Sequence, residues 1–477
     1  MTNNQHKNEI AAGHAGRVTE GVKALQGDPK KAIVKLAIPM IVAMFVQTIY
    51  SLVDTYWVSG LGADALAAMG FVFPFFCISM ALSNGIGIGG GAAISRRIGA
   101  KDKTGADNVA VHTIIIIFLL ALAFTLPFYM FAPQLFTLAG AGKTTELAVA
   151  YARVIFLGSI IIFFSNVANS ILRSEGDSKR AMRAMILGAV LNIILDPIFI
   201  YSFDMGIAGA AWATVISIAV SALLMANWLF FRKDTYVTFD FRDFHFDKKI
   251  VRDILNVSIP ASAEQLSMSL SMLFMNFIIV SVSSTDGVAV YATGWRIATI
   301  AIAPLMGIAT AVVSVSGAAI GSRDYVKAKT ALSYSTKLGF LTECGAGILI
   351  FTFATQIASI FTQAEGGAHI TADLAHFLRV MCLFYPIVAL GIFSSSFFQG
   401  AGRGVNAMIA TLLRTIVFTP FFAALFAFTL DMGQVGVWWG MVAGNGIGSV
   451  VLFLWARYFL RGLLRTERIG RAEGVAA

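Results

Sequence analysis

The sequence predicts an all-α integral membrane protein with twelve transmembrane helices in two six-helix lobes related by pseudo-two-fold symmetry. Three observations predict this fold. Of the 477 residues, 57% are hydrophobic and only 13% are charged, twelve apolar segments are long enough to span a bilayer, and the two halves of the chain resemble each other. Soluble domains carry about a quarter charged residues, so the composition excludes conventional cytosolic, secreted and disordered proteins.

The twelve segments follow one another with short polar connections, and a spanning helix needs about 20 apolar residues. We expect helices over residues 31–58, 66–93, 109–131, 148–171, 182–203, 208–231, 251–283, 288–318, 330–355, 374–398, 405–429 and 434–460. The first lobe covers 31–231 and the second 251–460, with tails at 1–30 and 461–477. The linker 232–250 alternates Phe with charged residues, which fits either a short strand or an amphipathic stretch on the headgroups.

Basic residues indicate the orientation. Of 35 Lys and Arg residues, 31 fall in seven clusters: Lys7 to Lys35, Arg96 to Lys103, Arg173 to Arg183, Arg232 to Arg252, Arg323 to Lys337, Arg403 with Arg414, and Arg457 to Arg471. These clusters occupy both tails and every even-numbered connection. By the positive-inside rule, we expect a cell-membrane protein with both termini in the cytoplasm. The topology also explains the net charge of +9 without a nucleic-acid partner.

Other short signals are negative. The polar first 28 residues contain no apolar stretch, so we expect no cleavable signal peptide and a first helix that targets the chain. Cys77, Cys344 and Cys382 lie singly in apolar segments, which indicates neither a disulfide framework nor a zinc site. The GxGxxG within Gly85 to Gly91 follows no strand, so it predicts close helix packing rather than a dinucleotide site.

The halves align when one is shifted by about 222 to 227 residues. Matching pieces are Ile98 to Asp102 with Ile320 to Asp324, and Asp204-Met205-Gly206 with Asp431-Met432-Gly433. Each repeat contains six helices, an even number, so both insert in the same orientation and are related by an axis along the membrane normal. This predicts a two-lobed transporter with a central cleft.

Polar residues within the first lobe form a candidate cation site. Asp54 in the first helix, Asn192 and Asp196 in the fifth and Thr214 in the sixth lie at matching depths, and the spacing of four puts Asn192 and Asp196 on one helix face. Ionisable groups are costly in hydrocarbon and therefore mark sites. Their hard oxygens suit Na⁺ or a shared proton. Pro197 adds a free carbonyl four residues earlier.

The duplication provides an internal control. At the repeat offsets the counterparts of these four residues are all apolar, namely Met275, Phe418, Phe422 or Ala423, and Met441. A purely architectural role would predict similar residues in both copies, so the polar set is specific to the first lobe. The alternative is that Asp54 lies in headgroup water and Asp196 caps a broken helix.

Further embedded polar residues are candidates for a drug-binding cleft: Gln47, Tyr50, Asn166, Asn169 and Glu264. For Glu343 and Arg379, which also lie in apolar segments, we favour pairing or snorkelling over a functional role.

Four features closely resemble the multidrug and toxic compound extrusion (MATE) family: the twelve-helix duplication, SLVDTYWVSGLG, LRSEGDSKRAM and LNIILDPIFIY. The resemblance runs from about residue 30 to 460. It implies two lobes in a V shape, and export of organic, often cationic compounds in exchange for inward Na⁺ or H⁺.

For the site, the resemblance implies a coupling cation at Asp54, Asn192, Asp196 and Thr214, with the Ala210 carbonyl as a further candidate ligand. Another branch of the family uses a second-lobe Glu in helix seven and an Asp in helix ten. This chain has Met268 at the helix-seven position and no Asp deep in helix ten. The resemblance also implies bending of helix one around Pro39.

We therefore expect a monomeric multidrug efflux antiporter, which takes small organic cations or lipophilic drugs from the bilayer, needs no cofactor and is not an enzyme. The alternative is a lipid-linked oligosaccharide flippase of the same superfamily, which should line its cleft with Arg or Lys. A third hypothesis, an intramembrane aspartyl protease, lacks its GxGD motif, because Ser174 precedes Glu175-Gly176-Asp177 in a loop.

Overall fold

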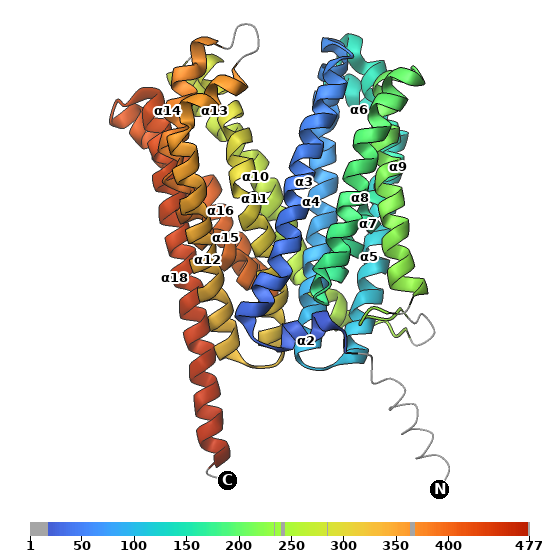
Figure 1. Ribbon diagram of the computed structural model, residues 1–477, viewed down its shortest axis with the longest axis vertical. Coiled ribbons are helices and arrows are strands. Elements are labelled where there is room, and N and C mark those ends of the chain that lie inside the picture. The colour runs from blue at the N-terminus through green and yellow to red at the C-terminus, as the bar shows by residue number, and fades with distance from the viewer. Residues whose placement is uncertain (1–17, 233, 240–243, 284, 363–367, 476–477) are drawn as a thin grey trace.

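The protein folds into two bundles of long helices that lie side by side (Figure 1), described by a computed structural model over residues 18–232, 234–239, 244–283, 285–362 and 368–475. These residues contain helices and no strand. The first lobe contains α3 (Pro29–Ser59), α4 (Ala63–Gly99), α5 (Lys103–Met130), α6 (Ala132–Leu138), η1 (Gly142–Thr144), α7 (Thr145–Ser174), α8 (Ser178–Pro197), η2 (Ile198–Ser202), α9 (Gly206–Ala226) and η3 (Asn227–Phe231). A short helix, α2 (Glu20–Gln26), precedes it.

The second lobe contains α10 (Lys248–Val282), α11 (Thr285–Gly321), α12 (Tyr325–Thr352), α13 (Ala354–Phe361), η4 (Ala368–Ile370), α14 (Thr371–Met381), α15 (Phe384–Gly400), α16 (Gly404–Leu412), η5 (Leu413–Phe418), α17 (Thr419–Ala424), η6 (Leu425–Thr429) and α18 (Gly433–Val475). Ten helical segments of the described chain are long and apolar enough to cross a membrane. Two bent pairs, α12 with α13 and α14 with α15, bring the number to twelve. The predicted fold class is confirmed.

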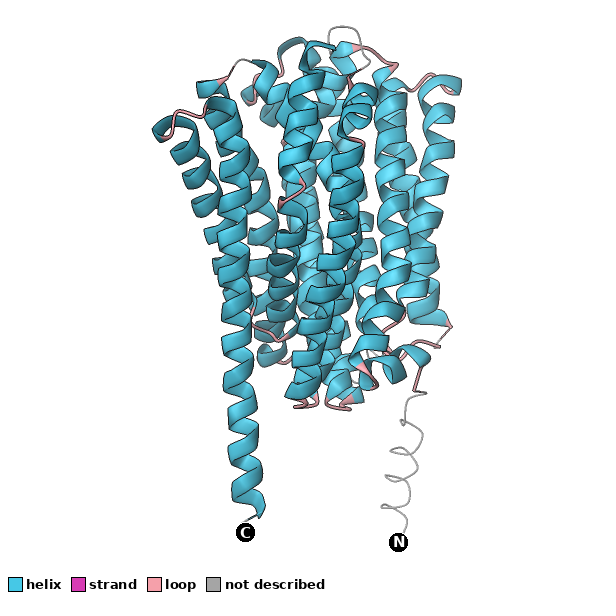
Figure 2. Ribbon diagram, turned by 60° about the vertical axis from the view of Figure 1, so that its left-hand side comes forward, coloured by secondary structure: helices cyan, strands magenta, loops and turns pink. Residues whose placement is uncertain are grey.

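Two features of the helices differ from the prediction. α12 and α13 meet at 73° and α14 and α15 at 52°, whereas we predicted continuous helices. α18 continues through the predicted tail as far as Val475, and Figure 2 shows its last turns projecting beyond the bundle. We call the side on which α2 and the end of α18 lie the terminal face, and the other side the open face.

Aspartates start the helices that rise from the terminal face. Asp28, Asp102, Asp177, Asp247 and Asp324 cap α3, α5, α8, α10 and α12, each accepting a hydrogen bond from a backbone N–H of the first turn. Such a cap stabilises a helix by about 1 kcal/mol. The caps recur at equivalent positions, since Asp102 and Asp324 differ by the repeat offset.

The duplication is visible in the backbone. Lys101 and Arg323 both have φ of 58°, and Asp204 and Asp431 have φ of 52° and 53°. Residues other than glycine rarely adopt this left-handed conformation, so its recurrence at matched positions supports the predicted repeat. Of the predicted linker 232–250, residues 248–250 belong to α10, and the other described residues, 232, 234–239 and 244–247, contain neither strand nor helix, so the strand alternative is wrong for the described residues.

Candidate functional site

A hydrogen bond connects the open-face end of α3 with η2, the continuation of α8, next to the predicted cation site. The Tyr201 hydroxyl donates to the Trp57 carbonyl at 2.6 Å. Beneath this bond Val58, Ile200 and Ala210 form a small buried cluster. Pro197 ends α8, and the chain continues as the π-helix η2. These contacts place the last turns of α3 against α8 and α9.

Asp196 is completely buried within this junction, with 0% of its surface exposed. Neither of its carboxyl oxygens has a hydrogen-bond partner among the described residues. Asp54 on α3 is close enough to interact with it electrostatically. The structure therefore brings the two predicted carboxyl groups together.

Asn192 and Thr214 complete a set of acceptor oxygens. The Asn192 amide donates to the Thr214 hydroxyl at 3.3 Å, and its carbonyl oxygen, Oδ1, is buried without a partner in the described chain. Three buried acceptor atoms therefore lack a donor: Oδ1 and Oδ2 of Asp196 and Oδ1 of Asn192. Buried acceptors are normally satisfied, so this geometry suits a bound cation or proton.

Two tyrosines flank the acidic pair. Tyr50, which we predicted in the drug cleft, lies within electrostatic range of Asp54 and Asp196 and next to Thr214. Tyr151, which the sequence analysis did not select, is near the same groups and packs against the cluster of Val58, Ile200 and Ala210. Its signal was its position at the open-face end of the buried stripe of α7, which continues at Ile155.

The two predicted backbone ligands differ in their surroundings. Ala210 lies within the regular helix α9, so its carbonyl already accepts the helical bond from the N–H of Thr214 and keeps one lone pair. Ile193 lies in α8 four residues before Pro197, which has no N–H to donate to it. The Ile193 carbonyl is therefore the freer acceptor.

The other drug-cleft candidates are scattered. Gln47 is exposed on α3. The Asn166 amide donates to Ser83 of α4 at 2.8 Å, and the Asn169 amide donates to the Ala181 carbonyl of α8 at 3.2 Å. Asn166 and Asn169 thus tie helices of the first lobe together.

Glu264 is the centre of a polar cluster in the second lobe. It accepts hydrogen bonds from Ser395 at 2.7 Å, from Gln399 at 3.4 Å and from Thr411 at 3.3 Å. Arg414 lies in η5, ten residues after the start of α16, and is buried within electrostatic range of Glu264. Arg414 was grouped with Arg403 as one basic cluster, but it lies in the interior of the lobe, within the helical stretch that we predicted over 405–429.

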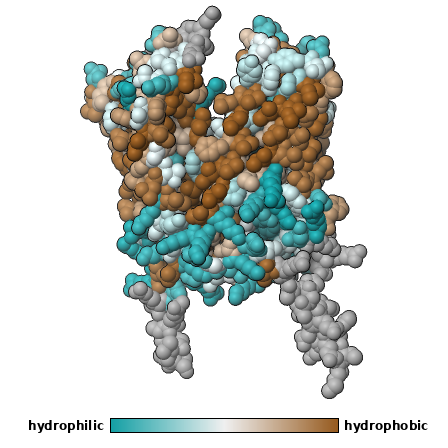
Figure 3. All heavy atoms as spheres, viewed as in Figure 1, coloured by the Kyte–Doolittle hydropathy of each residue, from teal (hydrophilic) through white to brown (hydrophobic). Residues whose placement is uncertain are grey.

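The lobes separate at the open face and meet at the terminal face. Figure 3 shows a notch with largely apolar walls between them at the open face. At the other end Arg96 of α4 pairs with Asp253 of α10 at 2.8 Å and donates to the Gly400 carbonyl at 3.1 Å. Gly85 and Gly89 bring α4 against Ser262 and Ser258 of α10, so the glycine-rich segment serves helix packing, as predicted.

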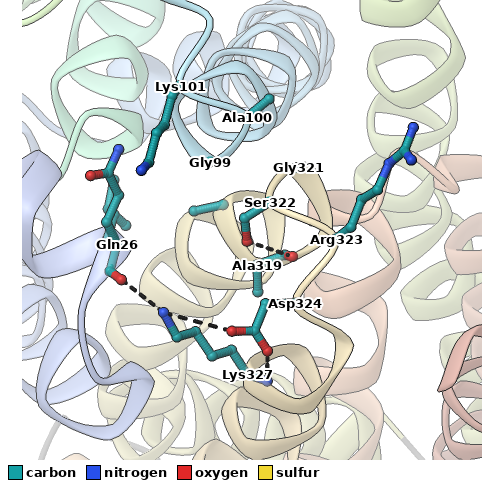
Figure 4. Close-up of a pocket in the computed structure, with 12 residues that line it drawn as sticks. Gln26, Gly99, Ala100, Lys101, Ala319, Gly321, Ser322, Arg323, Asp324 and Lys327 are labelled. Atoms are coloured by element: carbon teal, nitrogen blue, oxygen red, sulfur yellow. Dashed lines mark hydrogen bonds and ion pairs between the residues drawn. The ribbon is translucent and has the colours of Figure 1, made fainter. Parts of the chain in front are cut away.

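A cavity of about 710 Å³ lies at the terminal face, where α2 meets the ends of α4, α11 and α12. Figure 4 shows Lys327 donating to the Gln26 carbonyl and paired with Asp324 beside this cavity. None of the predicted site residues lines it. It is distinct from the notch of the open face.

Comparison with known proteins identifies the relatives of the chain. The model of the MatE family matches residues 39–198 and 260–425. The multidrug export protein MepA of Staphylococcus saprophyticus is 27% identical over 448 residues, covering 93% of this chain and 97% of that protein. Two solved structures, a MATE in complex with MaL6 and the outward-facing conformation of a multidrug resistance MATE family transporter of the MOP superfamily, are each 46% identical. Each covers 94% of this chain and 100% of the other, with a TM-score of 0.92.

Proposed function

The chain belongs to the MatE family, and from that premise we propose that it exports organic, often cationic compounds by antiport with H⁺ or Na⁺ bound in the first lobe. The family consists of transporters, so the protein is a transporter and not an enzyme, and the protease hypothesis is dropped. The observation that carries the cation site is the set of three buried acceptor oxygens on Asp196 and Asn192 that lack a hydrogen-bond partner among the described residues, with Asp54 close to them.

The terminal face is assigned to the cytoplasm. Most basic clusters of the sequence lie on it, among them Arg96 to Lys103 and Arg323 to Lys337, and such clusters stay on the cytoplasmic side of a membrane. The notch then opens to the outside, which agrees with the likeness to an outward-facing relative. The described state is thus the one that releases drug and accepts the cation.

The coupling follows from the position of the cation site. A cation on Asp54 and Asp196 connects α3 with α8 at the wall of the first lobe and changes the packing of these helices. Antiport requires that the cation and the drug favour different states of the transporter, because a ligand that binds both states equally shifts nothing. The cation entering from outside therefore lowers drug affinity in the outward-facing cleft.

The drug contacts are assigned to the notch. Its apolar walls suit lipophilic molecules, and Gln47 is the candidate polar residue on α3 that remains exposed. Flexible, apolar surfaces of this kind accept varied ligands. Glu264 supplies a negative charge in the second lobe and is a candidate for cationic drugs.

The flippase alternative requires basic side chains in the cleft to hold a pyrophosphate. Arg414 is buried deep in the second lobe, but it lies near Glu264, which offsets its charge. Export of lipophilic cations therefore fits better than transfer of a lipid-linked pyrophosphate.

The test is export of a fluorescent cationic dye from proteoliposomes under a proton gradient or a sodium gradient imposed separately. We expect one gradient to drive export by the wild type, and Asp196→Asn and Asp54→Asn to abolish the coupling. Asp204→Asn is the matched control, since Asp204 is exposed at the open face in a turn that Asn also tolerates. Normal export by Asp196→Asn under both gradients would contradict the proposal.

A further inference from the structure

Two acidic side chains within the membrane helices, one in each lobe, have the same kind of environment. In the described chain, Asp196 and Glu343 are the carboxyl groups with both oxygens buried and both without a hydrogen-bond partner. Each residue is 0% exposed. Asp196 belongs to the cation site above, whereas Glu343 lies on α12 of the second lobe and has no part in the proposed antiport mechanism.

Glu343 lies on the face of α12 that packs against α15. Gly339, Glu343 and Gly347 are four residues apart and share one helix face. A side-chain carbon on Gly339 would overlap the Phe393 ring, and one on Gly347 would lie 3.2 Å from the Cys382 carbonyl oxygen. Glu343 therefore faces the stretch of chain between Cys382, at the bend before α15, and Phe393.

This stretch contains polar groups without partners. Tyr385 is fully buried, its hydroxyl has no partner among the described residues, and it is within electrostatic range of Glu343 and Cys382. Pro386 has no N–H, so it cannot donate a helical bond to the Cys382 carbonyl. The 52° bend between α14 and α15 lies at this point.

In the part of the chain that the structure describes, no positively charged group is hydrogen-bonded to Glu343. The other titratable side chains that the structure describes on elements packed against α12 are Asp286, Tyr291 and Arg296 of α11, Asp373, His376 and Arg379 of α14, Lys30, Lys31, Lys35, Tyr50, Asp54 and Tyr56 of α3, and Arg457, Tyr458, Arg461, Arg465 and Glu467 of α18. None of them hydrogen-bonds to Glu343. Arg296 is exposed, and Arg379 donates to Thr355. An ionised carboxylate with no partner at such a position costs several kcal/mol, so the group is neutral in this state.

The duplication shows that the fold does not need an acid here. The caps Asp102 and Asp324 align α5 with α12 at an offset of 222 (324 − 102). At this offset the counterpart of Glu343 is residue 121 (343 − 222), a buried alanine. The first lobe thus has an apolar side chain at the position equivalent to Glu343, just as the second lobe has an apolar side chain at the position equivalent to Asp196.

We propose that Glu343 is a proton-binding site of the second lobe, which releases its proton when the bend at Cys382 and Leu383 opens to water. In this step the carboxyl O–H bond breaks, the proton passes to water and the carboxylate becomes hydrated; closure reverses it. Binding at Glu343 is separate from the Asp54 and Asp196 site.

The experiment is infrared difference spectroscopy of the membrane-reconstituted transporter after a pH jump, without drug. We expect a C=O band of a protonated carboxylic acid that titrates with pH and is lost in Glu343→Gln. Glu146→Gln, at an exposed position of α7, is the matched control and should keep the band. Because no transport is measured, this result does not depend on the proposed antiport.

A second measurement, made on the wild type, tests the proposal even if the Glu343→Gln variant does not fold. In the wild type, a hydrophobic carbodiimide should modify Glu343, detected by mass spectrometry, and modification should decline as the pH is raised. Tyr385→Phe should move the midpoint of the infrared band. A Glu343 signal that stays constant over all pH values at which the protein is folded would identify a static buried acid and overturn the proposal, as would the absence of any signal from Glu343.

Discussion

Gly99 and Gly321 make reciprocal contacts across the pseudo-two-fold axis at the terminal face. A side-chain carbon on Gly99 would overlap the Ala318 carbonyl, and one on Gly321 would overlap the Arg96 carbonyl. The two contacts are related by the repeat, since 99 and 321, and 96 and 318, both differ by 222. α4 and α11 therefore cross backbone to backbone, and this crossing closes the terminal end.

Replacing Gly321 by valine should open this crossing. The new side chain must push α4 away, and overpacking of this kind costs about 1–3 kcal/mol. We expect a shift toward states open at the terminal face. The measurement is the labelling rate of a cysteine introduced at Ser322, beside the cavity, by a membrane-impermeant maleimide. Gly345→Val is the control, because a side chain there meets nothing within 4 Å. Equal labelling in both variants would contradict the closure by Gly321.

The ion pair of Arg96 with Asp253 should contribute to the same closure. Removing either charge, in Arg96→Gln or Asp253→Asn, should weaken it by about 0.5–1 kcal/mol, as for a partly exposed pair. The double variant should lose less than the sum, because the pair couples the residues. Distances between spin labels on the two lobes measure the population of molecules that are closed at the terminal face. Lys143→Gln is the control: it removes an exposed ion pair with Asp64 inside the first lobe and should have no effect on the closure. If the effect of the double variant equalled the sum of the two single effects, Arg96 and Asp253 would not be coupled.

Most of the fold was predictable because hydropathy and the repeat are properties of long segments. The bends between α12 and α13 and between α14 and α15 were not predictable. Residues 353 and 382–383 lie within apolar sequence, so no loss of hydrophobicity marks the bends. Arg414 was grouped with Arg403 in one basic cluster, yet nine helical residues separate it from Gly404 and place it in the interior.

The candidate site was predictable for those residues whose neighbours follow from their depth in the membrane and from the helix face on which they lie. Asn192 and Thr214 were expected to meet and are hydrogen-bonded. Tyr151 was not predicted because a tyrosine near a helix end also fits a headgroup anchor. The neighbours of Tyr50 could not be predicted, because the side of α3 that meets α8 and α9 depends on how the helices pack.

Docking of the linker onto the first lobe should weaken as the pH rises. Burial raises the pKa of the Glu175 carboxyl to about 8, although the Val237 N–H donates to it at 3.0 Å. The folded pKa exceeds the unfolded value of about 4.3, so the stabilisation is fully present below that value and is lost as the pH rises through about 8.

Hydrogen exchange at Val237, corrected for the intrinsic pH dependence, measures this docking. Exchange should accelerate between these pH values in the wild type and be independent of pH in Glu175→Gln, which stays neutral. Asp107→Asn is the control, because Asp107 accepts hydrogen bonds from Thr238 of the same linker and does not contact Val237 through a hydrogen bond in the described chain. An equal pH dependence in Glu175→Gln would assign it to another group.

Thr214→Val tests whether the hydroxyl orients the cation site. The Asn192 amide loses its acceptor and can turn its N–H groups toward Asp196, whose oxygens then find a donor without a cation. We expect about a tenfold loss of apparent affinity for the coupling cation, or about 1.4 kcal/mol, measured as the cation dependence of dye export. Ser217→Ala is the control, since this buried hydroxyl on the same helix bonds only the Ala213 carbonyl. Wild-type affinity in Thr214→Val, together with loss of coupling in Asp196→Asn, would restrict the site to the carboxyl groups.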